Sequence, residues 1–448
     1  MPIQDWRDLE RLVLARDFKA VRTELSMFQD ADIADFMEEL NREQVVLVFR
    51  SLPKDRAAEI FSYLSVEMQE YIVSAITDQE VGSIIDQLFV DDAADFLEEM
   101  PASVVKRVLK NASSETRTLI NQFLQYPPHS AGSIMTAEFV DLKKTMLVSD
   151  AFQRIRRTAI DKETVYTCYV MDANRRLEGV VTVKELFLAD ENAIIGDIME
   201  TNVISASTSD DQEEVAALFS KYDFISLPVV DHENRLVGIV TFDDIMEVIH
   251  QEATEDFQKM AAMAPSDKPY LKTSILELAK NRIMWLMILM ISGMIIGGIL
   301  ERYEAAFVTL PILVTFIPML TDTGGNAGSQ SSTLVIRGMA LNEINTKDFG
   351  RVFMKELGVS LLVGAALAAA NFLRLLLTYP GEYMVALVVS LALFATVLLG
   401  KTVGSTLPLF AKKVNADPAI MAAPLITTIV DACALIIYFK IVELLLLP

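Results

Sequence analysis

A carboxylate stands in the middle of an apolar stretch near the C-terminal end of the chain. Asp431 lies between Ile429, Val430 and Leu435, eleven residues after Ile420, where the apolar stretch begins. A carboxylate at that depth in a bilayer costs roughly 2.5 to 3.5 kcal/mol on insertion scales, so it is expected to face water or a cation. Carboxylate oxygens are hard ligands that suit Mg²⁺ or Ca²⁺ better than softer metals. Asp431 is therefore the first candidate ligand for a divalent cation.

A polar segment interrupts another apolar region upstream. Residues 321–332 read TDTGGNAGSQSS and follow Pro311 and Pro318. Small residues let helix backbones approach closely, whereas freed carbonyls are tolerated only where they line a wet cavity. Simple helix packing and a pore lining both remain open, and in the second case Asn326 is the side chain expected in the pore.

Acidic residues gather on a predicted helix before the membrane region. Residues 242–260, FDDIMEVIHQEATEDFQKM, have the composition of one continuous helix. Most of its acids fall within a broad face at 3.6 residues per turn; they are Asp244, Glu247, Glu252, Glu255 and Asp256. Like charges repel unless water, salt or a cation screens them, so this face is either solvated or metal-sensing.

Charge is distributed unevenly along the 448 residues. The net charge is −22: residues 1–280 hold 28 Lys and Arg against 51 Asp and Glu, and residues 281–448 hold 11 against 10. An acidic soluble part excludes nucleic acid as a partner and favours cations. Cys168 and Cys433 are too few and too far apart in sequence for a disulfide framework or a thiolate site. No secretory signal is expected at the charged N-terminus.

Five apolar stretches predict five membrane spans. They cover residues 283–300, 305–335, 358–377, 383–400 and 420–447. Basic residues follow the second and fourth spans, so the positive-inside rule places the N-terminal domains in the cytoplasm and the C-terminus outside. We expect a multi-pass protein of the plasma membrane, surrounded by lipid.

The soluble part begins with a predicted α-helical domain over residues 1–128. DIADFMEEL at residues 32–40 is echoed by DAADFLEEM at 92–100, with a related pattern at 56–64, which indicates stacked helical hairpins of superhelical type. The leading aspartate of each echo is expected to cap a helix, and the glutamates to face water.

A second repeated module follows over residues 129–249. GSIMT at 132–136 returns as GDIMET at 196–201, and LEGVVTVKEL at 177–186 returns as LVGIVTFDDI at 236–245. This pattern resembles a pair of α/β cystathionine-β-synthase-type (CBS) domains. In that family a Thr followed three residues later by Asp can hold an adenosine ribose, and Thr241 with Asp244 fits, whereas the first half has Thr182 and Glu185. ATP is thus an optional ligand, and Thr241 as a plain helix cap is the alternative.

The whole chain resembles the MgtE family of magnesium transporters. The resemblance rests on residues 318–338, PMLTDTGGNAGSQSSTLVIRG, on residues 417–439, DPAIMAAPLITTIVDACALIIYF, and on the order of the modules. It implies a multidomain fold: a helical N domain (1–128), a CBS pair (129–249), a connecting plug helix (250–280) and an all-α transmembrane domain of five helices (281–448).

The resemblance also implies roles for individual residues. It implies a homodimer with one central pore, in which Asp431 binds hydrated Mg²⁺ and Asn326 and Glu356 are supporting polar positions. Mg²⁺ would be both substrate and regulator, because cytosolic ions bridging the soluble domains and the connecting helix would hold the pore shut. The regulatory positions would be Asp91 or Asp95, Asp211, Glu213, Asp223, Asp244, Glu247, Glu252, Glu255, Asp256 and Asp417.

Other function classes stay open or are disfavoured. A proton- or sodium-coupled carrier with Asp431 as its proton relay is the alternative to a channel. A membrane metalloprotease would need clustered histidines, but all three, His129, His232 and His250, precede the membrane region. A signalling receptor without a pore would not need Asp431 in the bilayer. We expect no enzyme.

Overall fold

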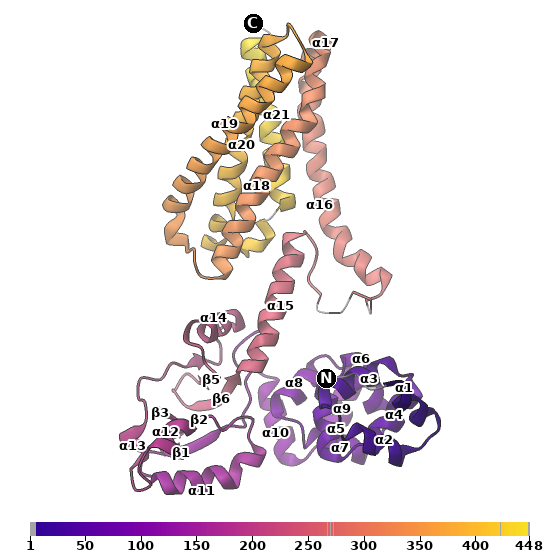
Figure 1. The fold of residues 1–448 in the computed structure, drawn as a ribbon, viewed down its shortest axis with the longest axis vertical. Helices are drawn as coiled ribbons and strands as arrows, with labels where there is room; N and C mark the ends of the chain where they lie inside the picture. The colour runs from indigo at the N-terminus through magenta and orange to yellow at the C-terminus, as the bar shows by residue number, and fades with distance from the viewer. Residues whose placement is uncertain (1–5, 267, 269, 272, 422, 447–448) are drawn as a thin grey trace. The chain divides into compact units, whose positions relative to one another are not determined.

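The computed structural model describes residues 6–266, 268, 270–271, 273–421 and 423–446. The chain divides into two compact units, Met1–Val248 and Ile249–Pro448 (Figure 1). The first contains a helical domain and two small sheets with their helices, and the second contains long helices. The helical N domain, the α/β pair and the helical C-terminal region that the sequence predicts are confirmed.

Short amphipathic helices build the N domain around one apolar core. They are α1 (Trp6–Leu14), α2 (Phe18–Leu25), α3 (Asp30–Glu39), α4 (Arg42–Ser51), α5 (Lys54–Ser62), α6 (Val66–Ala75), α7 (Asp78–Ile85), α8 (Val90–Glu98), α9 (Ala102–Asn111) and α10 (Ser114–Phe123). The large apolar residues of both predicted echoes are buried on α3 and α8. Burial of these stripes is the main force that holds such short helices together.

A repeated arginine tether ties this domain together. Arg56 donates to the carbonyl oxygens of Leu25 and Phe28 at 3.0 and 2.8 Å and to Asp30 at 2.7 Å. Arg107 makes the same kind of bonds, because it donates to the carbonyl oxygens of Val73 and Ile76 and to Asp78. The equivalent bonds relate α3 to α7 and α5 to α9, so they mark a structural repeat other than the echo between α3 and α8.

The predicted caps were wrong. Gln29 and Phe89 occupy the N-cap positions of α3 and α8, so Asp32 and Asp92 lie inside the first turn. A carboxylate there still favours the positive end of the helix dipole, which explains why the sequence pattern resembled a cap.

Two three-stranded sheets of identical topology form the second module. The first contains β1 (Val140–Lys143), β2 (Thr167–Met171) and β3 (Leu177–Thr182), and the second contains β4 (Ala206–Ser207), β5 (Ser226–Val230) and β6 (Leu236–Thr241). In each sheet the first pair is parallel and the second antiparallel. Thr136 pairs with Ile239 of the second sheet, and Glu200 pairs with Val180 of the first. Each copy of the repeated G-x-I-M motif therefore docks on one sheet.

Helices cover these sheets and join them to the N domain. They are α11 (Val148–Thr158), a 3-10 turn (Ala159–Asp161), α12 (Val183–Leu188), α13 (Ile195–Ile198) and α14 (Gln212–Tyr222). Val90 and Ala94 of α8 share an apolar core with Phe219, Val240 and Ile245 of the second half. The N domain and the CBS pair are thus packed through one continuous core.

The connecting helix α15 runs over Phe242–Met260, the range that the sequence predicts. The wider segment 250–280 is not one helix, because helical structure stops at Met260 and resumes at Ile275. The Ser274 hydroxyl accepts a hydrogen bond from the Glu277 amide at 3.2 Å and so starts the next helix.

The second unit is a bundle of long helices (Figure 1). It contains α16 (Ile275–Arg302), α17 (Glu304–Thr309), α18 (Ile317–Ala340), α19 (Phe349–Thr378), α20 (Tyr383–Lys413) and α21 (Ala423–Leu445), with 3-10 turns at Pro311–Phe316, Thr346–Asp348 and Pro418–Met421. Among the described residues, four helices, α16, α19, α20 and the one ending in α21, are long and apolar enough to cross a membrane. The more polar α18 packs against α20 and α21 and completes the five long helices predicted.

The long helices do not begin and end where the sequence predicts the spans. The second span does not begin at residue 305, since α17 and a 3-10 turn precede α18. The third and fourth helices are longer than predicted, so α19 already contains Glu356 and α20 continues past Gly400 to Lys413. The predicted end of the fifth span, residue 447, lies outside the described residues. Hydropathy places boundaries at the first charges, whereas these helices carry charges inside them.

The polar segment of residues 321–332 forms an unbroken part of α18. Backbones of α18 and α20 meet there, because Gly404 lies against the carbonyl of Gly328, and Gly400 against that of Gly324. Close helix packing, one of the two interpretations of this segment, is confirmed.

Replacing Gly404 by alanine should destabilise the bundle. The added Cβ would overlap the carbonyl oxygen of Gly328, which is backbone and cannot move alone. We expect the free energy of unfolding to fall by roughly 1 to 3 kcal/mol, as overpacking usually costs. Thermal unfolding in detergent measures this. Gly358→Ala on α19 is the matched control, since its Cβ meets no atom within 4 Å; equal melting of both variants would contradict the close crossing.

Candidate functional site

One face of α18 carries polar side chains that are exposed in the single chain. Asp322, Asn326 and Gln330 recur every four residues and therefore share a face. The opposite, glycine-bearing face is buried against α20 and α21. A polar stripe of this kind is unfavourable against lipid and is expected to face water or another polar surface.

Asp431 on α21 lies beside this stripe. Its Oδ1 is 3.7 Å from the position that a Cβ on Gly325 would take, and its carboxylate is close enough to Asp322 for the two charges to interact. One turn earlier, Thr427 and Thr428 donate their hydroxyls to the Pro424 carbonyl at 3.0 Å. Two helices thus bring the carboxylates of Asp322 and Asp431 near each other, and carboxylate oxygens suit a hydrated Mg²⁺ or Ca²⁺ ion. Asn326 also lies on this stripe.

Glu356 reaches α18 from the third long helix. Its Oε2 accepts a hydrogen bond of 2.6 Å from the Ser331 hydroxyl. The structure therefore places Glu356 next to α18, and its predicted role as a pore position stays a prediction.

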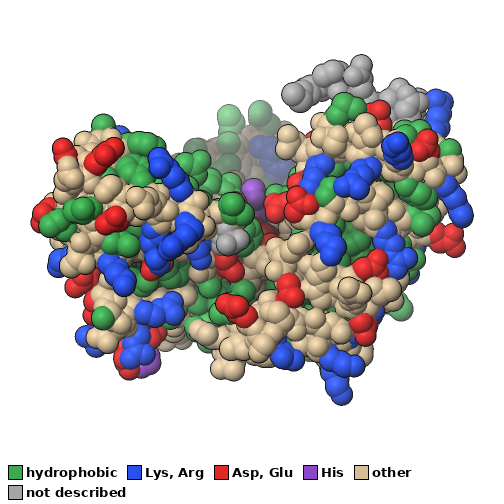
Figure 2. Space-filling model, turned by 90° about the horizontal axis from the view of Figure 1, so that it is seen from below, with side chains coloured by type: hydrophobic (Ala, Val, Ile, Leu, Met, Phe, Trp, Pro, Cys, Tyr) green, Lys and Arg blue, Asp and Glu red, His purple; other side chains and the backbone are tan. Residues whose placement is uncertain are grey.

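A second group of carboxylates lies where α8 meets the CBS pair. Burial, followed by the charge of Asp244, raises the pKa of Asp91 well above its usual range, and the same two causes raise that of Asp92 to about 7 and that of Glu163 to about 8. Burial raises the pKa of Asp244 to about 6 against the hydrogen bond from Thr241. Figure 2 shows acidic side chains on both lobes of this unit and in the hollow between them. We call Asp91, Asp92, Glu163 and Asp244 the docking cluster.

Two oxygens of the docking cluster lack partners. Asp91 Oδ1 and Glu163 Oε2 are buried without a hydrogen bond within the described chain. A buried carboxylate oxygen without a partner is costly, and a cation or its water shell would satisfy it. Mg²⁺ keeps several waters and is often held by one or two carboxylates, so these residues fit such an ion. Asp95 and Glu247 lie on the same helices, α8 and α15, and are solvent-exposed.

The remaining predicted acids of the second CBS half lie at the ends of α14. Asp211 caps the helix by accepting the Glu213 amide at 2.8 Å, and Asp223 follows the helix in a left-handed conformation with φ of 55°. All three are exposed. The structure does not bring them together with the docking cluster.

The C-terminal part of α15, from Ile249 on, belongs to the second unit and has its own ion pairs. Lys259 Nζ lies 2.5 Å from Glu255 and 2.6 Å from Asp417. Burial opposes a charged lysine, but these two bonds outweigh it and raise the pKa of Lys259. Burial and the charge of Asp417 raise the pKa of Asp256 to about 6. The Lys259 ammonium group thus lies among the carboxylates of Glu255, Asp256 and Asp417. Glu252 is on the same helix as Glu255 and Asp256.

The possible nucleotide residues contact each other. Thr241 is buried and donates its hydroxyl to Asp244. In the first half, Thr182 and Glu185 form a capping box at the start of α12. The two halves thus differ as the sequence indicates.

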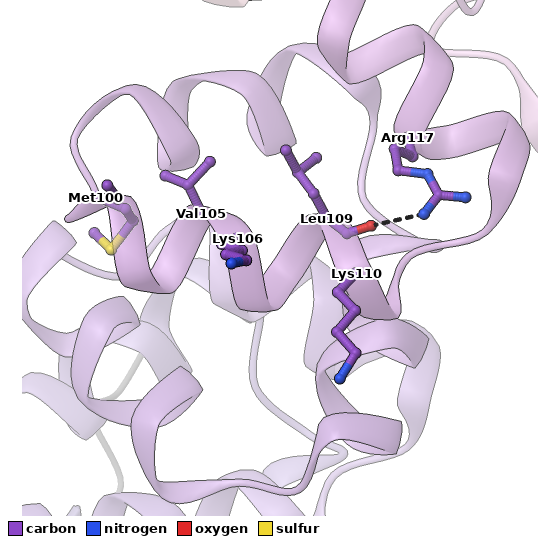
Figure 3. A pocket seen from close by; sticks show the side chains of 7 residues that line it. Met100, Val105, Lys106, Leu109, Lys110 and Arg117 are labelled. Atoms are coloured by element: carbon purple, nitrogen blue, oxygen red, sulfur yellow. Dashed lines mark hydrogen bonds between the residues drawn. The ribbon is translucent and has the colours of Figure 1, made fainter.

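Other features do not add a metal site. Among the described residues, no three His, Cys, Asp or Glu side chains form a group that could hold a metal ion as they stand. A hollow of about 670 Å³ on α9 and α10 is lined by Lys106, Lys110 and Arg117 beside apolar residues (Figure 3). Its positive charge makes it unsuited to cations.

Sequence reasoning missed several of these residues. Glu163 gave no periodic signal, because it follows a short 3-10 turn. Asp322 and Lys401 could have been found, since any charge inside an apolar span suggests a functional site.

The fold and the polar faces define a multi-pass membrane protein with an N-terminal soluble part that contains a CBS pair. A family model described as the MgtE intracellular N domain matches residues 28–129, CBS domain models match 131–192 and 195–251, and the MgtE model, a divalent cation transporter, matches 317–441. The magnesium transporter MgtE of Thermus thermophilus is 37% identical over 443 residues, 98% of each chain. That of Bacillus subtilis is 32% identical over 430 residues, 93% of this chain and 95% of that protein. This chain belongs to the MgtE family.

Solved structures agree for the soluble part. The cytosolic domain of the Mg²⁺ channel MgtE in complex with ATP is 36% identical, with a TM-score of 0.52, covering 54% of this chain and 98% of that one. The soluble part of a magnesium transporter matches with a TM-score of 0.52 and 29% identity, covering 55% of this chain and 96% of that one. The family's curated members named here are transporters rather than enzymes.

Proposed function

We propose that this chain is a magnesium channel of the plasma membrane that works as a homodimer. The observation that carries the proposal is the position of Asp431 beside the exposed stripe of Asp322, Asn326 and Gln330. Two copies that meet along these faces would remove the polar stripes from lipid and enclose a path lined by carboxylate and amide oxygens. Glu356 is a supporting position of that path. The N-terminal domains would be cytoplasmic and the C-terminus outside.

We further propose that cytosolic Mg²⁺ closes this channel. The carboxylates of the docking cluster repel one another when no cation is bound. A cation among them attracts all of them and so holds α8 against the CBS pair. The same argument applies to Glu255, Asp256 and Asp417 on the membrane side. The regulatory set would be completed by Asp95, Asp211, Glu213, Asp223, Glu247 and Glu252.

Mg²⁺ flux into proteoliposomes tests this function. With Mg²⁺ varied on the cytoplasmic face and no other gradient present, we expect fast flux at low Mg²⁺ and progressive inhibition as it rises. Flux that requires a proton or sodium gradient would instead establish the alternative, a coupled carrier in which Asp431 relays protons.

We propose ATP as a modulator bound by the second CBS half. A relative's cytosolic domain was solved with ATP, and this chain has the Thr and Asp of the ribose pattern at 241 and 244. Thr241→Ala should weaken ATP binding about fivefold, the usual effect of one lost hydrogen bond, as measured by calorimetry. Thr182→Ala at the equivalent position of the first half is the control and should leave ATP affinity unchanged. Equal effects of both substitutions would contradict this assignment.

A further inference from the structure

Lys401 is a buried cation inside a membrane helix. It lies about 18 Å along α20 from the helix end at Lys413, and only 5% of it is exposed. A lysine at such a position is costly and persists where a partner compensates its charge. The proposed ion pathway makes no use of Lys401.

Its partners come from two other helices. Lys401 Nζ donates to the Ser331 hydroxyl of α18 at 3.4 Å, and this hydroxyl donates to Glu356 Oε2 of α19 at 2.6 Å. Ser331 is itself 1% exposed. The lysine, the hydroxyl and the carboxylate therefore form a chain that links three helices, which we call the three-helix tether.

The tether lies on the side of α18 away from the exposed polar stripe. Ser331 is nine residues after Asp322, which is about 180° around a helix at 100° per residue. It shares a face with Gly324 and Gly328, where α18 and α20 touch. The glycine contact fixes how closely the helices approach but leaves rotation and sliding of α18 less restrained, and the tether supplies directional bonds for both.

We propose that Lys401 is a positioning residue of the ion pathway. Through Ser331 and Glu356 it sets the rotation of α18, and so decides where Asn326 and Asp322 point relative to Asp431. Glu356 serves as its counter-charge. The role in ion flux rests on the proposed function, but the charge pairing does not.

A double-mutant cycle on the full-length protein tests the tether. Lys401→Met leaves the half-buried Glu356 carboxylate without its counter-charge, so we expect maximal Mg²⁺ flux to fall by roughly tenfold and half-saturating Mg²⁺ to rise. Glu356→Gln alone leaves the buried Lys401 without its counter-charge, and its Mg²⁺ flux should fall similarly. The double variant K401M/E356Q removes both charges and should recover most of the thermal stability that either single variant loses, which loss of packing alone would not allow. Lys413→Met, at the exposed end of α20, is the control.

Each outcome decides the proposal. If Lys401→Met does not fold but the double variant folds, the charge pairing is supported. Unchanged flux in Lys401→Met, a double variant no more stable than the single ones, or an equal effect of Lys413→Met overturns it. Thermal unfolding of the four proteins reports the pairing without any ion flux, so its coupling can be measured even if the unsubstituted chain moves no Mg²⁺ and the proposed function itself fails.

Discussion

Replacing Asp431 by asparagine is expected to reduce Mg²⁺ flux into proteoliposomes by about 100-fold, equivalent to roughly 2.7 kcal/mol of lost ion stabilisation. The substitution keeps the size of the side chain and one acceptor oxygen but removes the negative charge beside the α18 stripe. Fold and expression should be preserved, since an amide is less costly than a carboxylate inside a membrane. A loss of flux would then result from the missing negative charge of Asp431 and not from altered packing of α21.

Two further variants sharpen this prediction. Asp431→Glu keeps the charge and should retain more flux than the asparagine variant. Glu443→Gln removes an exposed carboxylate from the same helix, where it pairs with Lys440 at 2.7 Å, and should conduct normally. If the asparagine variant conducts at half the original rate, Asp431 is not the central ligand of the pathway.

Much of the fold could be predicted because repeats and periodicity are local signals. The connecting helix and the five long helices can each be seen within about 30 residues of sequence. The duplicated sheet module shows as motifs that return at residues 196 and 236 after 132 and 177. The ends of the long helices could not be predicted as well. The fourth span was predicted to stop at residue 400, because hydropathy treats Lys401 as an end, whereas Ser331 and Glu356 compensate this charge from two distant helices.

The candidate sites show the same division. Asp431 and Asn326 could be found because their chemistry contrasts with apolar neighbours. The docking cluster could not be assembled, since Glu163 and Asp91 are brought together only by packing of α8 on the CBS pair. One signal was present in the echoes: position 31 is alanine where position 91 is aspartate, so the second echo carries an extra acid that the repeat does not need.

The docking cluster should make the contact between α8 and the CBS pair depend on pH. Burial raises the pKa of Asp92 from 3.8 to about 7 and that of Glu163 from 4.5 to about 8, so the packed state binds protons more tightly than the separated state. Their contribution to the contact is fully present below about pH 4 and is lost as pH rises through about 7 to 8. In chelator, we therefore expect the two domains to separate as pH increases from 5.5 to 8.5. Mg²⁺ should restore the contact at pH 8.5, because it replaces the missing protons as counter-charge.

The distance between spin labels on the N domain and the CBS pair of the full-length protein measures this response. The variant D92N/E163Q removes two of the charges, and we expect it to stay packed across the pH range and to lose most of its response to Mg²⁺. Asp32→Asn is the matched control, because Asp32 occupies the position of Asp92 in the first echo and is exposed. A domain distance that does not change with pH or Mg²⁺ in the unsubstituted protein would show that repulsion within the cluster is too weak to move the domains, and cytosolic sensing would then have to reside in Glu255, Asp256 and Asp417.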